Sequence, residues 1–343
     1  MKRHLNTLFV TTQGAYLAKE GEAVLVRVEK ETRLRVPLHT LGGIVCFGQV
    51  GCSPALMGMC GEAGVSLSFM TEHGRFLARV QGFTPGNVLL RREQYRRADD
   101  LPAALEIAKP MIAAKIANSR TVLLRGARDH GERVDPTVLR TATTYLDRCI
   151  SEARAAPTLD SLRGVEGESA RAYFGAFGSL ITAQREAFAF RERSRRPPLD
   201  NINALLSFLY TLLAHDARAA CESAGLDPAV GFLHRDRPGR PGLALDLMEE
   251  FRAFLADRLA LSLINRRQVQ GSGFRTSDSG GVVMDDDTRK TVLVAFQKRK
   301  QEEIRHPFLG ETTTVGLLLH LQARLLARYM RGDLDGYPPF IWR

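Results

Sequence analysis

The sequence predicts an α+β protein in which a small N-terminal β-rich domain, residues 1–86, precedes a larger all-α domain, residues 87–343. Short β-branched or alternating segments, separated by glycine turns, continue to about residue 81. Helical periodicity then runs from residue 91 to the end of the chain. The length of 343 residues is sufficient for two domains.

The strands expected in the first domain are short and follow one another closely. We expect strands at residues 8–11, 16–19, 23–28, 34–36, 44–47, 66–70 and 75–81. The segment 44–47 is apolar throughout, which predicts a strand covered on both faces. A single helix, 55–63, is expected after Ser53 as N-cap and Pro54 in the first turn, and Gly64 ends it. The domain is expected to end near residues 82–86.

The second domain shows a succession of amphipathic helical patterns. We expect helices at residues 101–126, 136–154, 158–186, 201–223, 242–266, 285–304 and 312–331, after a basic opening at 91–97. Two segments interrupt them. Residues 191–198 are basic and end in two prolines, which predicts a linker. Residues 270–281 are rich in glycine and serine, which predicts a loop with the composition of a mobile segment.

The composition favours a folded protein with a polyanionic partner. The chain is 44% hydrophobic and 25% charged, with a net charge of +10 and a pI of about 9.7. Its five cysteines are an odd number without a Cys-x-x-Cys pair, which predicts buried thiols in a reducing cytoplasm and excludes a disulfide framework. No apolar signal segment follows Met1, and the longest apolar run, 204–214, is too short to cross a bilayer.

The segment from His234 to Arg252 holds the strongest chemical signal. Asp246 and Glu249 are three residues apart on a predicted helix, so they are expected on one face. The apolar face of this helix is expected to consist of four other residues, while Glu250 and Arg252 point elsewhere. Those four are Leu243, Leu247, Phe251 and Phe254.

A histidine and two carboxylates beside a basic Pro/Gly loop indicate a divalent metal acting on an anion. Carboxylates suit Mg²⁺ or Mn²⁺, and an imidazole shifts the preference toward Mn²⁺. Nucleic-acid phosphate is the anion that the flanking Arg235, Arg237 and Arg240 predict. The alternative is a solvated helix face beside a capping or core histidine. The two glycines and two prolines of the loop favour the metal site, because they fix a tight backbone path.

Glu166 is the third candidate carboxylate. It lies between Gly164 and Gly167 in a helical pattern, where glycine is unfavourable by about 1 kcal/mol relative to alanine. Such glycines allow a ligand or another backbone to approach closely. The alternative is a helix start or helix crossing with an incidental glutamate. Glu168 is expected to face another side of this helix.

Clusters of basic residues complete the set of candidate contacts with nucleic-acid phosphates. Each cluster can neutralise phosphates, and each can equally be a solvated face. The candidates are Arg91, Arg92, Arg96, Arg97, Arg193, Arg195, Arg196, Arg235, Arg237, Arg240 and Arg252. Nucleotide-binding glycine loops and Ser–His–Asp catalysis find no support, since no Walker lysine and no nucleophile elbow occur.

Three ordered motifs, at Arg163–Phe174, Arg196–Tyr210 and Gly231–Arg252, resemble those of the CRISPR-associated integrase that inserts new spacers, with the type I-C branch as the nearest. The resemblance implies a β-rich N-terminal domain used in dimerisation and a helical catalytic domain. It also implies a homodimer that forms a heterohexamer with the small second adaptation protein. The family's metal site maps onto Glu166, His234 and Asp246, with Glu249 at the second acidic position. Many members have aspartate where Glu249 stands.

The resemblance implies a metal-dependent DNA integrase and endonuclease that uses Mg²⁺ or Mn²⁺. A captured DNA fragment is expected to attack a phosphodiester of the CRISPR array through its 3′-hydroxyl, with Glu166, His234 and Asp246 as catalytic residues. Two alternatives remain at this stage. One is a stand-alone metal-dependent nuclease, and the other is a non-catalytic nucleic-acid scaffold.

Overall fold

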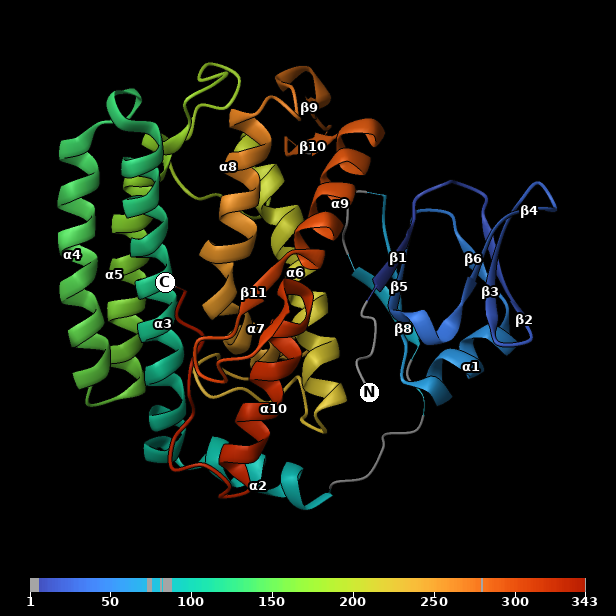
Figure 1. Cartoon of the computed structure of the whole chain (residues 1–343), viewed down its shortest axis with the longest axis horizontal. Helices are drawn as coiled ribbons and strands as arrows, with labels where there is room; N and C mark the ends of the chain where they lie inside the picture. Colours follow the sequence, from blue (N-terminus) through green and yellow to red (C-terminus); the bar gives the residue numbers. More distant parts are fainter. Residues whose placement is uncertain (1–5, 73–75, 81, 83–87, 279, 343) are drawn as a thin grey trace. The chain divides into compact units, whose positions relative to one another are not determined.

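The computed structural model of the chain describes residues 6–72, 76–80, 82, 88–278 and 280–342. The chain divides into two compact units, residues 1–86 and 87–343 (Figure 1). Sheets dominate the first unit and helices dominate the second, so the predicted α+β class is confirmed. None of the helices in the described ranges is long and apolar enough to cross a membrane.

The N-terminal unit consists of two four-stranded sheets and one helix. Its elements are β1 Asn6–Val10, β2 Tyr16–Glu20, β3 Ala23–Val28, β4 Glu31–Pro37, β5 Leu41–Phe47, β6 Gly51–Cys52, α1 Pro54–Ala63, β7 Ser66–Met70 and β8 Phe76–Val80. Each strand expected from the sequence overlaps one of these, and the ends of the expected strand 75–81 lie outside the described residues. The strand order is β1-β5-β7-β8 in one sheet and β4-β3-β2-β6 in the other.

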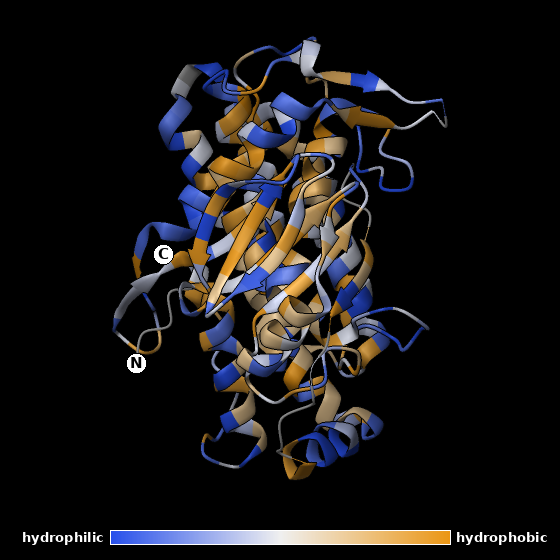
Figure 2. Ribbon diagram, turned by 90° about the vertical axis from the view of Figure 1, so that its right-hand side faces the viewer, coloured by the Kyte–Doolittle hydropathy of each residue, from blue (hydrophilic) through white to orange (hydrophobic). Residues whose placement is uncertain are grey.

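β5 is an inner strand of the first sheet, where it pairs in parallel with β1 on one side and with β7 on the other. Ile44, Val45, Cys46 and Phe47 are all buried, which confirms that this strand is covered on both faces. Figure 2 shows orange, apolar stretches along the strands of the unit.

α1 begins after Ser53, whose hydroxyl accepts a hydrogen bond from Leu56 N at 3.3 Å. As predicted, it ends at a glycine in the left-handed region, Gly64 at φ +66°.

The second unit contains nine helices among the described residues, together with two short β-hairpins. The helices are α2 Val88–Asp99, α3 Leu101–His130, α4 Pro136–Ala155, α5 Leu159–Phe177, α6 Asn201–Ser223, α7 Gly242–Met248, α8 Arg258–Asn265, α9 Asp286–Gln301 and α10 Leu318–Met330. The hairpin strands are β9 Phe274–Thr276, β10 Val282–Met284, β11 Glu303–Arg305 and β12 Thr312–Thr314.

Three long helices, α3, α4 and α5, lie side by side in this unit (Figure 1). Each begins at a side chain that accepts backbone N–H groups of its first turn. Asp100 accepts from Ala103 N, Asp135 from Thr137 N and Val138 N, and Thr158 from Ser161 N. α3 and α5 therefore have fixed starts, and both of them carry residues of the candidate site.

The expectation of an all-α second domain was wrong in one respect, because two hairpins interrupt the helices. β9 lies within the segment 270–281 that was expected as a loop, and β10 follows that segment directly. β11 and β12 replace the ends of the helices expected at 285–304 and 312–331. Strands of three residues are too short to produce a recognisable alternating pattern. The run Thr312–Thr314, which is β-branched throughout, was the available signal for β12.

The helix expected at 242–266 is also interrupted. After α7, residues Glu249–Phe251 form a 3₁₀ turn and Arg252–Asp257 form a π-helical turn, before α8 resumes. Leu243, Leu247, Phe251 and Phe254 are buried, as predicted. The changes of pitch alter the directions of the side chains between Asp246 and Asp257 relative to a regular helix.

Glu250 connects this interrupted helix to the C-terminal segment around residues 337–340 through hydrogen bonds. Its carboxylate accepts hydrogen bonds from Tyr337 Oη at 2.6 Å, Gln322 Nε2 at 3.0 Å and Phe340 N at 2.7 Å. Asn118 Nδ2 donates to the backbone oxygens of both Glu250 and Phe340. The expectation that Glu250 points away from the core was therefore wrong, since it is fully buried. Burial raises the pKa of Glu250 to about 8, although its hydrogen bonds act in the opposite direction.

We expect Glu250→Gln to become progressively more stable than the wild type as the pH rises from about 5 to about 8. Because the pKa of Glu250 is about 8 in the folded chain and 4.5 ordinarily, the folded chain retains a proton that the unfolded chain has lost. Folding stability therefore falls with rising pH in this window, by up to about 1.4 kcal/mol per pH unit. Urea unfolding of both chains across the window measures the difference, and a pH-independent difference would contradict the assignment.

Candidate active site

Asp246 binds both the backbone and the imidazole of His234. The carboxylate of Asp246 accepts Phe232 N at 2.6 Å and Leu233 N at 3.0 Å on Oδ2, and His234 N at 3.1 Å on Oδ1. The same Oδ1 lies 2.6 Å from His234 Nδ1. Four groups thus converge on one carboxylate that is 1% exposed. This network places the proton of the neutral imidazole on Nδ1, so Nε2 is left as the acceptor.

Two glycines permit the close approach of the chain segments on either side of this carboxylate. A Cβ on Gly231 would lie 2.6 Å from the backbone of Gly242 and 2.7 Å from Asp246 Oδ2. A Cβ on Gly242 would lie 2.7 Å from Ala229 O. The backbone of Gly242 also donates to Ala229 O at 3.0 Å. These two glycines, one before His234 and one at the end of the Pro/Gly loop, therefore allow the two segments to pack closely around Asp246.

Two side chains from other helices anchor the segment that precedes His234. Arg163, one turn before Glu166 on α5, donates through Nε and Nη2 to Leu233 O at 2.9 and 2.6 Å. Gln94 on α2 is buried and donates to Asp227 O at 2.8 Å and Val230 O at 2.7 Å. The histidine loop is consequently tied to the helix that carries Glu166.

Lys115 of α3 joins the remaining two candidate carboxylates. Its ammonium forms an ion pair with Glu166 of α5, and its Nζ lies 2.8 Å from Glu249 Oε2. Arg252 Nη1 binds the other oxygen, Glu249 Oε1, at 3.1 Å. Glu249 is 3% exposed and Lys115 8% exposed, whereas the side chain of Glu166 is 30% exposed. Two acids from different helices thus share one cation at the surface of the core.

The charges around Glu249 favour its ionised form. Burial by itself raises its pKa, but Arg252 and Lys115, together with His234, outweigh burial and hold the pKa below its ordinary value. Glu249 is therefore a carboxylate at neutral pH, and His234 is close enough to contribute to that effect.

A small cavity of about 40 Å³ adjoins this cluster, and both Lys115 and Glu166 line it. Asp257 also lines it and accepts hydrogen bonds from Tyr210 Oη at 2.6 Å and Tyr173 Oη at 3.0 Å. Burial raises the pKa of Asp257 to about 6. The carboxylate of Asp257 therefore makes part of the cavity wall polar. The cavity is large enough for a water molecule.

The four residues expected at the metal site have two kinds of surroundings. Glu166 and Glu249 share Lys115, whereas Asp246 uses all four of its acceptor positions on the histidine loop. Asp246 and Glu249 have different partners, since Asp246 binds the histidine loop whereas Glu249 binds Lys115 and Arg252. Among the residues that the structure describes, no three histidine, cysteine, aspartate or glutamate side chains are grouped closely enough to hold a metal ion.

The basic candidates for DNA binding fall into three groups. Arg193 donates to Asn203 Oδ1 at 2.6 Å and Ser207 Oγ at 3.1 Å, and Arg252 binds Glu249, so both are engaged within the protein. Arg91, Arg97 and Arg240 are partly exposed. The exposed members are Arg92, Arg96, Arg195, Arg196, Arg235 and Arg237.

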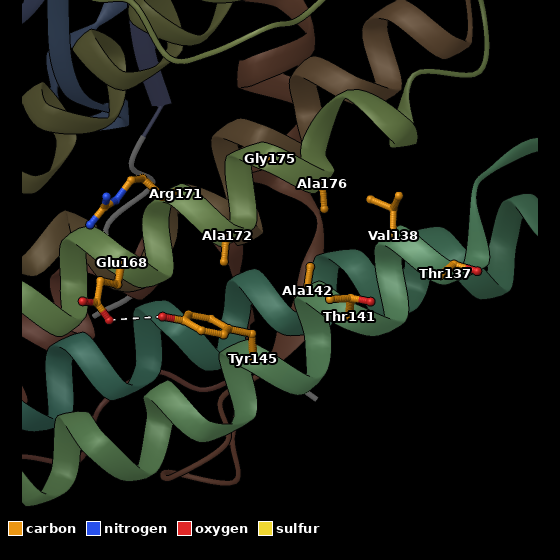
Figure 3. Close-up of a pocket in the computed structure, with 10 residues that line it drawn as sticks. All are labelled: Thr137, Val138, Thr141, Ala142, Tyr145, Glu168, Arg171, Ala172, Gly175 and Ala176. Carbon is orange, nitrogen blue, oxygen red and sulfur yellow. Dashed lines mark hydrogen bonds between the residues drawn. The ribbon is translucent and has the colours of Figure 1, made fainter.

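Glu168 lies in different surroundings from Glu166, as predicted. It accepts a hydrogen bond from Tyr145 Oη at 3.1 Å and lines a groove of about 670 Å³ between α4 and α5 (Figure 3). The rest of this groove is mostly small and apolar. Its other lining residues are Thr137, Val138, Thr141, Ala142, Arg171, Ala172, Gly175 and Ala176.

Reasoning from the sequence missed Lys115, Arg163 and Gln94. Lys115 had a detectable signal, since it occupies a core position in the apolar stripe of α3. A charged residue at such a position requires a buried partner of opposite charge. Arg163 and Gln94 bind backbone oxygens far away in the sequence, for which no local pattern exists.

Comparison with known proteins identifies the family. Residues 8–298 match the sequence profile of the family described as CRISPR associated protein Cas1. The CRISPR-associated endonuclease Cas1 1 of Chlorobaculum tepidum is 57% identical over 343 residues, which cover 100% of both chains.

Two solved structures share the fold. A casposase bound to its integration product has a TM-score of 0.84 and 23% identity over 99% of this chain and 95% of that one. A chain of a Cas6-RT-Cas1–Cas2 complex has a TM-score of 0.82 and 24% identity over 100% of this chain and 36% of that one. The profile match and the full-length relative confirm the family that the three motifs predicted: the chain belongs to the Cas1 family of CRISPR-associated proteins.

Proposed function

We propose that this protein is a metal-dependent DNA integrase and endonuclease of CRISPR adaptation. It inserts captured DNA fragments into the CRISPR array by attack of a fragment's 3′-hydroxyl on a phosphodiester. The observation that carries the proposal is the convergence of Glu166 and Glu249 on one cation, beside a histidine whose Nδ1 is fixed. The full-length relative is named an endonuclease, and one structural neighbour is a casposase bound to its integration product.

The chemical types of the donor side chains fit Mg²⁺ or Mn²⁺, although in this structure Lys115 occupies the place between the two acids and the three donors are not grouped closely enough to hold an ion. Glu166, Glu249 and Nε2 of His234 are the groups that would hold the ion, because two carboxylates and one imidazole suit these cations. Asp246 has its acceptor positions filled, so we assign it to the orientation of His234 instead of to direct ligation. A bound divalent ion supplies Lewis-acid stabilisation of charge on the scissile phosphate and activation of the attacking hydroxyl.

Side chains of the protein orient the reacting groups and position the imidazole that can accept a proton. Asp246 keeps the Nε2 atom of His234 available to ligate or to accept a proton, and Arg163 fixes the loop against α5. Strand transfer breaks one phosphodiester and forms another, so it is nearly isoenergetic and depends on positioning. With water in place of the 3′-hydroxyl, the same site would hydrolyse DNA, which accounts for an endonuclease activity.

The exposed arginines are the proposed phosphate contacts. The side chains of Arg92, Arg96, Arg195, Arg196, Arg235 and Arg237 are exposed, so a DNA backbone can reach each of them. Arg235 already binds Asp160 at 2.9 Å, so DNA would compete with that exposed pair. Arg193 and Arg252 instead support the site from within.

The proposed partners are DNA, a second copy of this chain and the small second adaptation protein. One structural neighbour is part of a complex that includes Cas2, which supports the last of these. We assign dimerisation to the N-terminal unit and a heterohexamer to the assembled state, as in the type I-C-like resemblance. Unpaired cysteines and a DNA substrate are consistent with activity in the cytoplasm.

A strand-transfer assay tests this function. Labelled duplex with free 3′-hydroxyl ends is mixed with a supercoiled repeat-bearing plasmid, Mg²⁺ or Mn²⁺ and the second adaptation protein. We expect wild type to join label to the plasmid only with metal, and His234→Ala to lose about a hundredfold or more in rate while it retains DNA binding. Degradation without joining would indicate a stand-alone nuclease. Joining by His234→Ala at the wild-type rate would refute the site.

A further inference from the structure

Lys115 occupies the position between the two acids that are the best candidates for metal ligands. Its ammonium contacts Glu166 and lies 2.8 Å from Glu249. A lysine that is 8% exposed in an apolar helix face needs compensation for lost hydration, and these two carboxylates supply it. The contact also relieves the repulsion that two adjacent carboxylates would otherwise experience.

Without any added ion, the charges of this cluster already balance. Glu166 and Glu249 carry two negative charges, and Lys115 and Arg252 carry two positive ones. A divalent cation bound by both acids would lie beside the Lys115 ammonium, with strong like-charge repulsion in a poorly hydrated setting. The ammonium must therefore move before both acids can ligate the ion.

The structure provides a place for the displaced ammonium. The cavity of about 40 Å³ is lined by Lys115 and by Asp257, Tyr210 and Tyr173, and also by Arg195 and Arg252. Arg252 is already paired with Glu249. Each oxygen of Asp257 accepts one tyrosine hydroxyl, so each retains an acceptor position. The lysine stem has several rotatable bonds, which allows the ammonium to turn without movement of the helix.

We propose that Lys115 is an internal cation that holds Glu166 and Glu249 together in the metal-free protein and is displaced toward Asp257 when a divalent ion binds. This inference rests on the proposed metal site at Glu166 and Glu249. Lys115 acts through those carboxylates, so it is a positioning residue. It stabilises the fold without metal and weakens metal binding, because the ion must displace it.

Mn²⁺ titration tests the proposal, with free Mn²⁺ measured by electron paramagnetic resonance in the absence of DNA. We expect Lys115→Met to bind Mn²⁺ about tenfold more tightly than the wild type, because no internal cation has to be displaced. We also expect it to unfold at a lower temperature without metal, and added Mn²⁺ to restore much of the loss. Lys109→Met, on the same helix with one exposed partner at 3.0 Å, is the matched control and should change neither property.

Two further variants make the test decisive. Lys115→Gln, whose amide can still bind both carboxylates, replaces Lys115→Met if that chain does not fold, and the same tighter binding is expected. Asp257→Asn should weaken Mn²⁺ binding when Lys115 is present and have no effect in Lys115→Met. Equal or weaker Mn²⁺ binding by Lys115→Met and Lys115→Gln would overturn the proposal, as would an Asp257→Asn effect that does not depend on Lys115. Wild-type binding that survives Glu249→Gln would instead refute the metal site itself.

Discussion

Replacing Glu249 by glutamine is expected to lower the rate of strand transfer by about a thousandfold, while the chain remains folded. Glutamine preserves the shape of the side chain but removes its charge, so it becomes a poor partner for both Lys115 and a divalent ion. The 3% exposed carboxylate is held ionised by Arg252 and Lys115. A group kept charged at that burial is suited to bind a further cation.

The neighbouring glutamate provides a matched control for that substitution. Glu250 is as deeply buried, but its partners are Tyr337, Gln322 and the backbone N–H of Phe340. Glu250→Gln keeps the size and most of these hydrogen bonds, so we expect its strand-transfer rate to stay within about threefold of the wild type. Single-turnover rates at saturating metal measure both variants. A similar loss in both would mean that Glu249 supports the fold of this segment and not the reaction.

The candidate site of His234, Asp246 and Glu249 shows which features could be predicted from the sequence and which could not. Asp246, Glu249 and His234 were identified as one constellation from their order and from the intervening Pro/Gly loop. Their division of labour could not be predicted, because it depends on partners that are distant in the sequence. A regular helical repeat placed both acids on one face. In the structure Asp246 binds the histidine loop, and Glu249 binds Lys115 of α3.

In the fold too, elements with local sequence signals could be predicted, whereas elements that depend on distant contacts could not. Strands such as β3 and β5, and helices with strong N-caps such as α3 and α4, were predictable because their signals are local. The two hairpins of the second unit were not, since three-residue strands have almost no pattern. Lys115 lies between these cases. Its position in an apolar stripe indicates a buried ion pair, but only tertiary structure shows that Glu166 and Glu249 are the partners.

Asp246→Asn is expected to lower the stability of the metal-free protein by about 2–4 kcal/mol and to reduce strand transfer by about 10- to 100-fold. The carboxylate receives three backbone N–H groups and the Nδ1 of His234. An asparagine has only one acceptor oxygen, so its NH₂ group must face donors and leave buried N–H groups unsatisfied. The freed imidazole would also lose its fixed tautomer and orientation.

Mn²⁺ binding by this variant separates a positioning residue from a metal ligand. If Asp246 were a ligand, its neutralisation would abolish Mn²⁺ binding, whereas the loss of metal-free stability would follow from the broken hydrogen bonds in either case. If Asp246 positions His234, Mn²⁺ binding through Glu166 and Glu249 must weaken only modestly. Mn²⁺ titration distinguishes the two roles, and urea unfolding without metal measures the loss of stability in the same variant. The four hydrogen bonds on a carboxylate that is 1% exposed make the second outcome the expected one.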